Sequence, residues 1–114
     1  MTKIVINNCF GGFSLSLAAT KWLAERRLKQ AIDSLKDKGS FFEHEGEIEF
    51  LGFYAFVPRH DALLVECVEA LGAAASGDCA ELVIKTIEGN QYIIEEYDGA
   101  ERIKEPKDIE WVTV

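Results

Sequence analysis

The chain has 114 residues, of which 48% are hydrophobic and 28% charged, which is typical of one globular domain covering residues 1–114 and excludes a disordered or fibrous protein. Its formal net charge of −8 argues against binding along polymeric nucleic acid, because such binding depends on Lys and Arg neutralising phosphates. No apolar run reaches the length of about 18 residues that spans a membrane, and the first residues lack the apolar core of a signal peptide, so we expect a cytoplasmic protein.

The first segments predict a strand followed by a helix. Residues 3–7, KIVIN, form a continuous β-branched run, which is typical of a buried strand rather than an edge strand. Gly11 and Gly12 end that strand. An apolar helical pattern then begins after Ser14 or Ser16, either of which suits the N-cap position of a helix.

The predicted first helix changes its buried side part of the way along. Leu28, Ile32 and Leu35 fall on the opposite side from the apolar positions of the first turns. We therefore expect a bend or break near Arg26–Arg27 and a second segment that ends at Lys38–Gly39, where glycine stops the helix. The alternative is one long helix that buries two faces.

Arg26 projects toward the middle of the first apolar stripe, where an apolar residue is expected. A buried arginine needs a carboxylate, a partner subunit or an anionic ligand. The alternative is a side chain whose stem covers apolar surface while its guanidinium reaches water near the helix end.

Residues 47–57, EIEFLGFYAFV, alternate in hydrophobicity and predict a strand at the aromatic centre of the protein. One face of this strand would carry Ile48, Phe50, Tyr54 and Phe56. Gly52 marks a bulge or a close backbone approach. The preceding FFEHEGE is expected to be a loop or the other strand of a hairpin.

Asp61 is a good N-cap for a second helix, which follows the stop at Pro58. The apolar positions of this helix recur at helical spacing and are Leu63, Leu64, Cys67, Val68 and Leu71. Gly72 lies inside this helix or just beyond it, and the segment Ala-Ser-Gly at residues 75–77 ends it.

Three strand-like runs follow, at residues 80–88, 91–97 and 100–104. Gly89–Asn90 and Asp98–Gly99 separate them and are strong hairpin signals, so we expect an antiparallel meander. Residues 109–114 have strand propensity and would return to the sheet or pack on a second chain. The predicted fold class is α+β, a single small domain with an antiparallel sheet and two main helices.

The loop NNCFGGFSLS, residues 7–16, lacks the groups that phosphate chemistry needs. A phosphatase-type loop would place an arginine six residues after Cys9, where Leu15 stands, and no histidine lies nearby in the sequence to activate the thiol. A nucleotide-triphosphate loop would need a lysine after the glycines. We therefore predict no catalytic residue.

Two places in the sequence suit a small anion. Backbone N–H groups around Gly11 and Gly12 can receive one, unless these glycines only shape a tight turn and Phe13 anchors the core. Arg59 stands at the predicted start of the second helix, where its fork and the helix dipole favour a phosphate; the alternative is a solvated turn that Asp61 only caps. The three cysteines match no metal-ligand spacing, and we expect neither metal nor cofactor.

Three segments form a distinctive combination: KIVINNCFGGFSLS, PRHDALLVECVEALGAAASG and AELVIKTIEGNQYIIEEYDG. Together they resemble the first type of Thoeris anti-defence protein, a family of small phage and prophage proteins. The resemblance covers residues 3–13, 57–77 and 80–103, over half of the chain.

This resemblance implies a non-enzymatic sponge in the host cytoplasm, which binds cyclic ADP-ribose isomers and holds them without cleavage. It implies self-association, with dimers assembling toward hexamers. It also implies capture of cyclic oligonucleotide signals at a separate site that depends on the oligomer. Each of these properties is an expectation for this chain.

The site residues that the resemblance implies correspond here to Arg26 or Arg27, Arg59 and Asn90. Our first hypothesis adds stacking of adenine on Phe13 and a cradle of loop amides at Gly11 and Gly12, in a site enclosed between subunits. The chain departs from the family pattern around Trp111, which has no adjacent basic residues, and over residues 28–46, which are longer than the pattern requires.

Two other functions compete with a sponge. A protein-binding inhibitor of a host or defence protein would use the acidic surface that the charge of −8 provides. An enzyme acting on nucleotides is a third hypothesis, but the sequence offers no metal cluster, triad or paired His and Cys for it.

Overall fold

The computed structural model describes residues 1–55 and 57–114 and has an α+β fold, as the sequence predicts. In chain order its strands and helices are β1 (Thr2–Asn7), α1 (Leu17–Glu25), α2 (Lys29–Lys36), β2 (Phe41–His44), β3 (Glu47–Phe50), α3 (Ala62–Leu71), β4 (Leu82–Ile87), β5 (Ile93–Tyr97) and β6 (Ala100–Lys104). Short 3-10 helices lie at Lys38–Ser40, Gly72–Ala75 and Pro106–Asp108. The strands form three antiparallel pairs, β1 with β4, β2 with β3 and β5 with β6.

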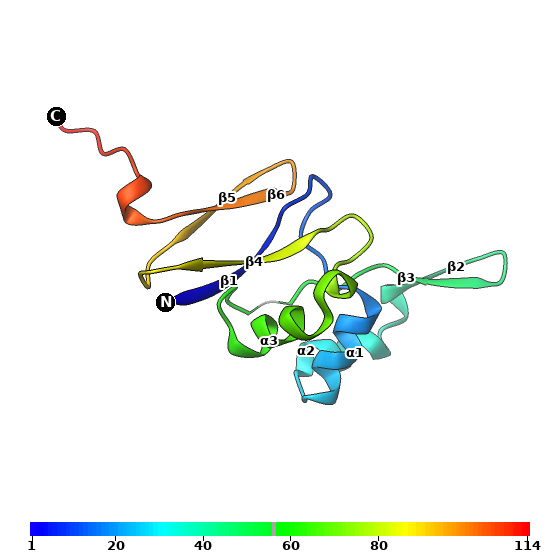
Figure 1. Cartoon of the computed structure of the whole chain (residues 1–114). Helices are drawn as coiled ribbons and strands as arrows, with labels where there is room; N and C mark the ends of the chain where they lie inside the picture. Colours follow the sequence, from blue (N-terminus) through cyan, green and yellow to red (C-terminus); the bar gives the residue numbers. More distant parts are fainter. Residues whose placement is uncertain (56) are drawn as a thin grey trace.

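The β1–β4 ladder is the middle layer of the molecule, and each of its faces packs against a different partner (Figure 1). Val5 and Leu82 belong to the apolar cluster that includes the three helices. Ile4 and Ile6 point to the other face, where side chains of the β5–β6 hairpin cover them. This explains why β1 is apolar without alternation, since a strand covered on both faces needs no polar side.

The break in the first predicted helix is confirmed. Helix α1 ends at Glu25, Arg27 adopts a left-handed φ of 67°, and α2 begins at Lys29. Ser16 is the N-cap of α1, because its hydroxyl accepts a hydrogen bond of 3.1 Å from the Ala19 N–H.

Helix α3 is also confirmed. The Asp61 carboxylate accepts hydrogen bonds of 3.1 Å from the backbone N–H groups of Leu63 and Leu64, as an N-cap does. Leu64 and Cys67 on its predicted apolar face are buried. The helix ends at Leu71, before the stop predicted at residues 75–77, because Gly72 at the C-cap has a positive φ of 57°.

The long strand predicted over residues 47–57 is wrong. Strand β3 ends at Phe50, and the segment before it is the other strand of a hairpin, which was one of the two expectations for it. Beyond it Gly52, with φ of 103°, changes the chain direction, and Phe53 exchanges backbone hydrogen bonds of 2.8 and 3.1 Å with Leu15. The pairing with Leu15 changes which side chains of the segment face the core. Phe53 is therefore buried, whereas Ile48, which the predicted strand would place on its apolar face, is 71% exposed.

The aromatic face expected for that strand is therefore not the centre of the core. Tyr54, which was expected on the apolar face, is 45% exposed, whereas the next residue, Ala55, is buried. Phe56 lies outside the described residues. A Cβ on Gly52 would lie 3.4 Å from the Ser14 Cβ, which is ordinary van der Waals contact, so the positive φ and not the expected close approach favours glycine there.

The predicted meander is half correct. The β5–β6 hairpin turns at Asp98 and Gly99, whose φ angles of 51° and 89° suit a tight hairpin turn. Strand β4, however, pairs with β1 and not with β5. After Gly89 and Asn90 the chain crosses to the outer layer, so β5 covers a face of the β1–β4 ladder instead of extending its edge.

Residues 109–114 form no strand and do not return to a sheet. They extend away from the layers at the C-terminal end of the chain, and Trp111 is 77% exposed (Figure 1). Among the described residues, no helix combines the length and apolarity needed to cross a membrane.

Candidate functional site

Arg59 forms a buried ion pair with Glu101. Its Nη1 and Nη2 atoms lie 2.6 and 2.9 Å from Oε1 and Oε2 of Glu101, a bidentate geometry. The two side chains are only 11% and 5% exposed. The Glu101 carboxylate also accepts a hydrogen bond of 2.8 Å from the Asn7 N–H, and the Val5 carbonyl accepts one of 3.3 Å from Arg59. The pair thus fastens the start of α3 to β1 and β6.

Aromatic rings surround the same guanidinium. Its Cζ atom lies 3.7 Å from the centroid of the Phe13 ring and 5.8 Å from that of Tyr54. Burial opposes the charge of Arg59, but hydrogen bonds to Glu101 and Tyr54 outweigh it and raise the pKa of Arg59 above its usual value. Phe13 and Arg59, both predicted as ligand residues, therefore lie together, with the protein's own carboxylate in the place of an anion.

The glycine loop packs closely on its own chain. A Cβ on Gly11 would lie 1.9 Å from the Cys79 carbonyl oxygen, so no other residue fits there. Gly12 has φ of 88°, and the backbone of Gly99 packs against it. The buried side chain of Asn7 supports this arrangement by donating hydrogen bonds of 2.7 Å to the carbonyls of Cys9 and Gly99. The tight-turn interpretation accounts for these contacts.

Arg26 adopts the second arrangement predicted for it, in which the stem covers apolar surface and the guanidinium reaches water. Its guanidinium carbon lies 3.4 Å above the Trp22 ring, and its Nη1 donates a hydrogen bond of 3.1 Å to the Trp22 carbonyl. The side chain is 42% exposed. No contact among the described residues joins it to Arg59 or Asn90.

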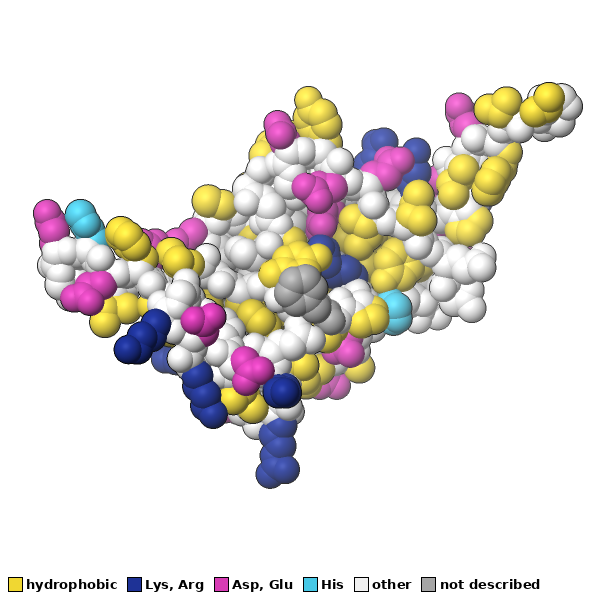
Figure 2. Space-filling model, turned by 180° about the vertical axis from the view of Figure 1, so that it is seen from behind, with side chains coloured by type: hydrophobic (Ala, Val, Ile, Leu, Met, Phe, Trp, Pro, Cys, Tyr) yellow, Lys and Arg dark blue, Asp and Glu magenta, His cyan; other side chains and the backbone are white. Residues whose placement is uncertain are grey.

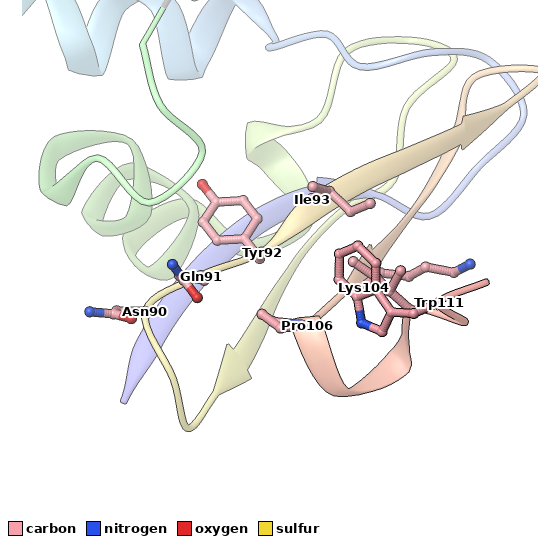
Figure 3. Close-up of a pocket in the computed structure, with 8 residues that line it drawn as sticks. Asn90, Gln91, Tyr92, Ile93, Lys104, Pro106 and Trp111 are labelled. Carbon is pink, nitrogen blue, oxygen red and sulfur yellow. The ribbon is translucent and has the colours of Figure 1, made fainter. Parts of the chain in front are cut away.

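Asn90 lines a groove on the side of the β5–β6 hairpin that faces away from the Arg59–Glu101 pair. This cavity of about 490 Å³ is lined by Asn90, Gln91, Tyr92, Ile93, Lys104, Pro106, Ile109 and Trp111, and we call it the Asn90–Trp111 groove. Figure 3 shows the Asn90 amide and the Trp111 indole at its two ends. The indole is 77% exposed, so one of its faces is available to a flat ring.

Two cations share one carboxylate beside this groove. Lys104 Nζ lies 2.9 Å from Oε1 of Glu95, and Arg102 Nη2 lies 3.0 Å from Oε2. The hydrogen bonds from Lys104 and Arg102 lower the pKa of the Glu95 carboxyl, so Glu95 stays ionised and neutralises one of the two cations. A single positive charge is left on the trio. The groove can therefore hold an anionic group next to an aromatic ring.

Tyr92 also lines the groove, and it packs against the buried cluster of Ile4, Ile6 and Ile87. Its hydroxyl lies 2.7 Å from Nδ1 of His60, at the start of α3, which holds the phenol ring in place. Burial raises the pKa of Tyr92, so the hydroxyl stays protonated at neutral pH.

The thiol of Cys67 is not a nucleophile. It is buried between α3 and α1, where desolvation raises its pKa to about 11 although the charge of Arg26 acts in the other direction. Within residues 1–55 and 57–114, no three His, Cys, Asp or Glu side chains gather in a way that could hold a metal ion.

Sequence reasoning missed the residues that complete both clusters. Glu101 sits in the run Ala-Glu-Arg-Ile-Lys, which is mostly charged and gives no sign that Glu101 is buried. Lys104 and Tyr92 likewise looked like ordinary strand residues. Asn7 offered a signal, because an amide that ends a buried apolar strand must find partners.

No known family model matches the chain, and no curated protein or solved structure is similar to it at a significant level. The resemblance to Thoeris anti-defence proteins therefore stays a prediction.

Proposed function

We propose that this protein is a non-enzymatic sponge that binds a cyclic nucleotide signal and sequesters it in the Asn90–Trp111 groove. One observation carries the proposal: an exposed indole, a side-chain amide and an ammonium group line a single groove of about 490 Å³. A nucleotide offers the matching groups, namely a flat base, polar ring edges and phosphates.

Each group has a distinct role in this proposal. The base stacks on Trp111, since aromatic stacking accepts any base. The amide of Asn90 donates and accepts hydrogen bonds at the base or ribose. Lys104 attracts the phosphates, aided by the net positive charge that it shares with Arg102 and Glu95. Asn90 is also a site residue that the family resemblance implies.

Arg59 then has a positioning role. A ligand phosphate at Arg59 would have to displace Glu101, and that carboxylate would be left buried without its main partner. The loop at Gly11 and Gly12 and the ring of Phe13 support the same cluster, which orders the elements on which the groove is built.

The resemblance supplies the ligand class and the biological role of the proposal. The ligand is a cyclic ADP-ribose isomer, and capture lowers the free concentration of an immune signal in the host cytoplasm. Self-association belongs to the same proposal, because the groove is open beside the exposed Trp111 and a small ligand is held tightly only when it is enclosed.

Calorimetric titration of the full chain with cyclic ADP-ribose isomers, cyclic dinucleotides and AMP tests this function. We expect a cyclic ADP-ribose isomer to bind. The Trp111→Ala variant should bind it about tenfold more weakly, since stacking on one base contributes about 1–3 kcal/mol. The Lys104→Met variant should also bind about tenfold more weakly, because it loses the ammonium group that attracts the phosphates. Lys85→Met, which removes a charge from an exposed residue that does not line the groove, should leave the affinity unchanged.

Recovery of the ligand separates a sponge from an enzyme. After incubation and denaturation, chromatography should return the ligand intact, whereas new products would show turnover. Absence of binding to every nucleotide in the panel, or binding that Trp111→Ala does not weaken, would contradict the proposed site.

A further inference from the structure

The β2–β3 hairpin is an arm that stands clear of the three layers. Every residue from Phe42 to Glu49 is exposed, and Figure 1 shows the arm reaching outward from the base of β3. Phe42 and Ile48 are 51% and 71% exposed, which is unusual for large apolar side chains. A two-stranded hairpin without a packing partner is only marginally stable in water, so the arm gains stability from a surface that covers it.

One face of this arm is shaped for a basic side chain. It carries a hollow of about 380 Å³ lined by Phe42, His44, Glu47, Ile48 and Glu49. The rings of Phe42 and His44 stack at 6.1 Å and form an aromatic wall, and two carboxylates flank it. A Lys or Arg stem can pack on such a ring while its charge meets the carboxylates.

The charge of the arm is strongly one-sided. Residues 41–50 contain four glutamates and neither Lys nor Arg. The hollow therefore selects a positively charged surface.

The same chain carries such a surface on α1 and α2. Six of its 12 Lys and Arg residues lie between residues 21 and 38, against three acidic residues. Arg27, Lys29 and Lys36 are all exposed. Figure 2 shows dark blue side chains gathered below these helices, while magenta and yellow side chains cover the arm beside them.

We infer that the arm of one copy docks on the basic α1–α2 face of a second copy of this chain. Figure 1 shows the arm directed away from its own α1 and α2, and all the residues that line the hollow are exposed. Two chains that each carry a charge of −8 repel one another over most of their surfaces. The contact between the acidic arm and the basic α1–α2 face instead brings opposite charges together. Lys29 and Lys36, two helical turns apart, face the carboxylates of the arm.

This inference names a surface for the self-association in the proposed function, but it rests on the arm and the helices and not on the groove. Mass measurements test the surface and nucleotide titration tests the groove, so the two can fail separately.

Light scattering of the full chain after size-exclusion chromatography tests the docking surface. The wild-type mass should exceed the monomer mass of 12.7 kDa in low salt and fall toward it in high salt. Reversal of the arm charges in Glu47→Lys/Glu49→Lys, and of the helix charges in Lys29→Glu/Lys36→Glu, should each give a monomer. An equimolar mixture of the two variants should associate again, because the reversed arm of one matches the reversed helices of the other.

Matched charge reversals elsewhere provide the control. Glu66→Lys/Glu88→Lys and Lys85→Glu/Lys107→Glu change the net charge equally on exposed residues outside the arm and the two helices, and both should associate like the wild type. Far-UV circular dichroism should be the same for all variants.

Three results would overturn the inference. They are a wild-type mass of 12.7 kDa in low salt, arm variants that associate like the wild type, and a mixture that stays monomeric. If the wild type is monomeric but its arm binds a lysine-rich peptide, the occupant is a foreign basic protein and the second copy is the wrong partner.

Discussion

The guanidinium of Arg59 joins segments that are far apart in the sequence. It pairs with Glu101 on β6, donates to the carbonyl of Val5 on β1, and lies over the ring of Phe13. The charges are almost fully buried, so each needs the other to offset the loss of water. This residue therefore contributes to the assembly of the layers more than its place in a turn suggests.

We expect Arg59→Met to lower the free energy of unfolding by about 3–5 kcal/mol, because it leaves the Glu101 carboxylate buried without its cation. Arg102→Met removes an equally charged side chain that is 74% exposed, and should cost less than about 1 kcal/mol. Denaturant unfolding followed by tryptophan fluorescence measures both. The double variant Arg59→Met/Glu101→Leu should recover much of the loss, and equal costs for Arg59→Met and Arg102→Met would contradict this account.

Sequence reasoning at the residue scale worked where the cause is local. Asp61 was predicted as a cap, and Ser16 was one of two candidates beside Ser14, because a capping side chain bonds backbone groups only two or three residues away. Arg59 was singled out too, but its partner lies 42 residues further along the chain. Nothing in the run that contains Glu101 marks it as a buried anion.

At the element scale, the β5–β6 turn and the glycine loop hold each other in place. Gly99 combines a φ of 89° with a backbone so close to the loop that a Cβ would lie 2.3 Å from the Gly12 nitrogen. Gly12 has a nearly identical φ of 88°, but a Cβ added to it would meet no atom within 4 Å. The two glycines therefore differ in crowding and share their backbone conformation.

We expect Gly12→Ala to cost about 1–2 kcal/mol from backbone conformation alone. Gly99→Ala should cost about 1–3 kcal/mol more, because it adds overpacking against the loop to the same penalty. Thermal unfolding of the two variants beside the wild type measures the difference. Similar melting temperatures for both variants would mean that the loop moves aside freely.

The elements also differ in how far their sequence specified them. Helix α3 has a cap, a continuous apolar face and a stop within one short segment, and it was predicted closely. Strand β3 was predicted too long, because the alternation continued past Gly52 while the backbone pairing changed to Leu15. Strand β4 was predicted correctly as a strand, but its partner is β1.

The whole molecule is elongated, with principal extents of 60 × 28 × 23 Å, because the arm and the C-terminal segment extend from the layered body (Figure 1). Its stability is therefore expected to be uneven. The β1–β4 ladder is covered on both faces, whereas every residue of the β2–β3 arm from Phe42 to Glu49 is exposed.

Hydrogen exchange read by mass spectrometry should follow this division. In dilute, high-salt solution, the amides of the arm should exchange early, and those of β1 and β4 should exchange only with global unfolding. Self-association in low salt should slow amide exchange in the arm and leave the exchange of β1 and β4 unchanged. Protection of the arm equal to that of β1 in dilute high salt would show that it is stable by itself.

The α+β class, the Asp61 cap, the break at Arg26–Arg27 and the turn at Asp98–Gly99 could be predicted from the amino-acid sequence, because each depends on groups a few residues apart. The pairing of β4 with β1, the burial of Glu101 beside Arg59 and the groove shared by Asn90 and Trp111 became visible only in the folded chain. Strand partners, buried charges and grooves depend on which surfaces exclude water together, and that depends on the whole chain at once.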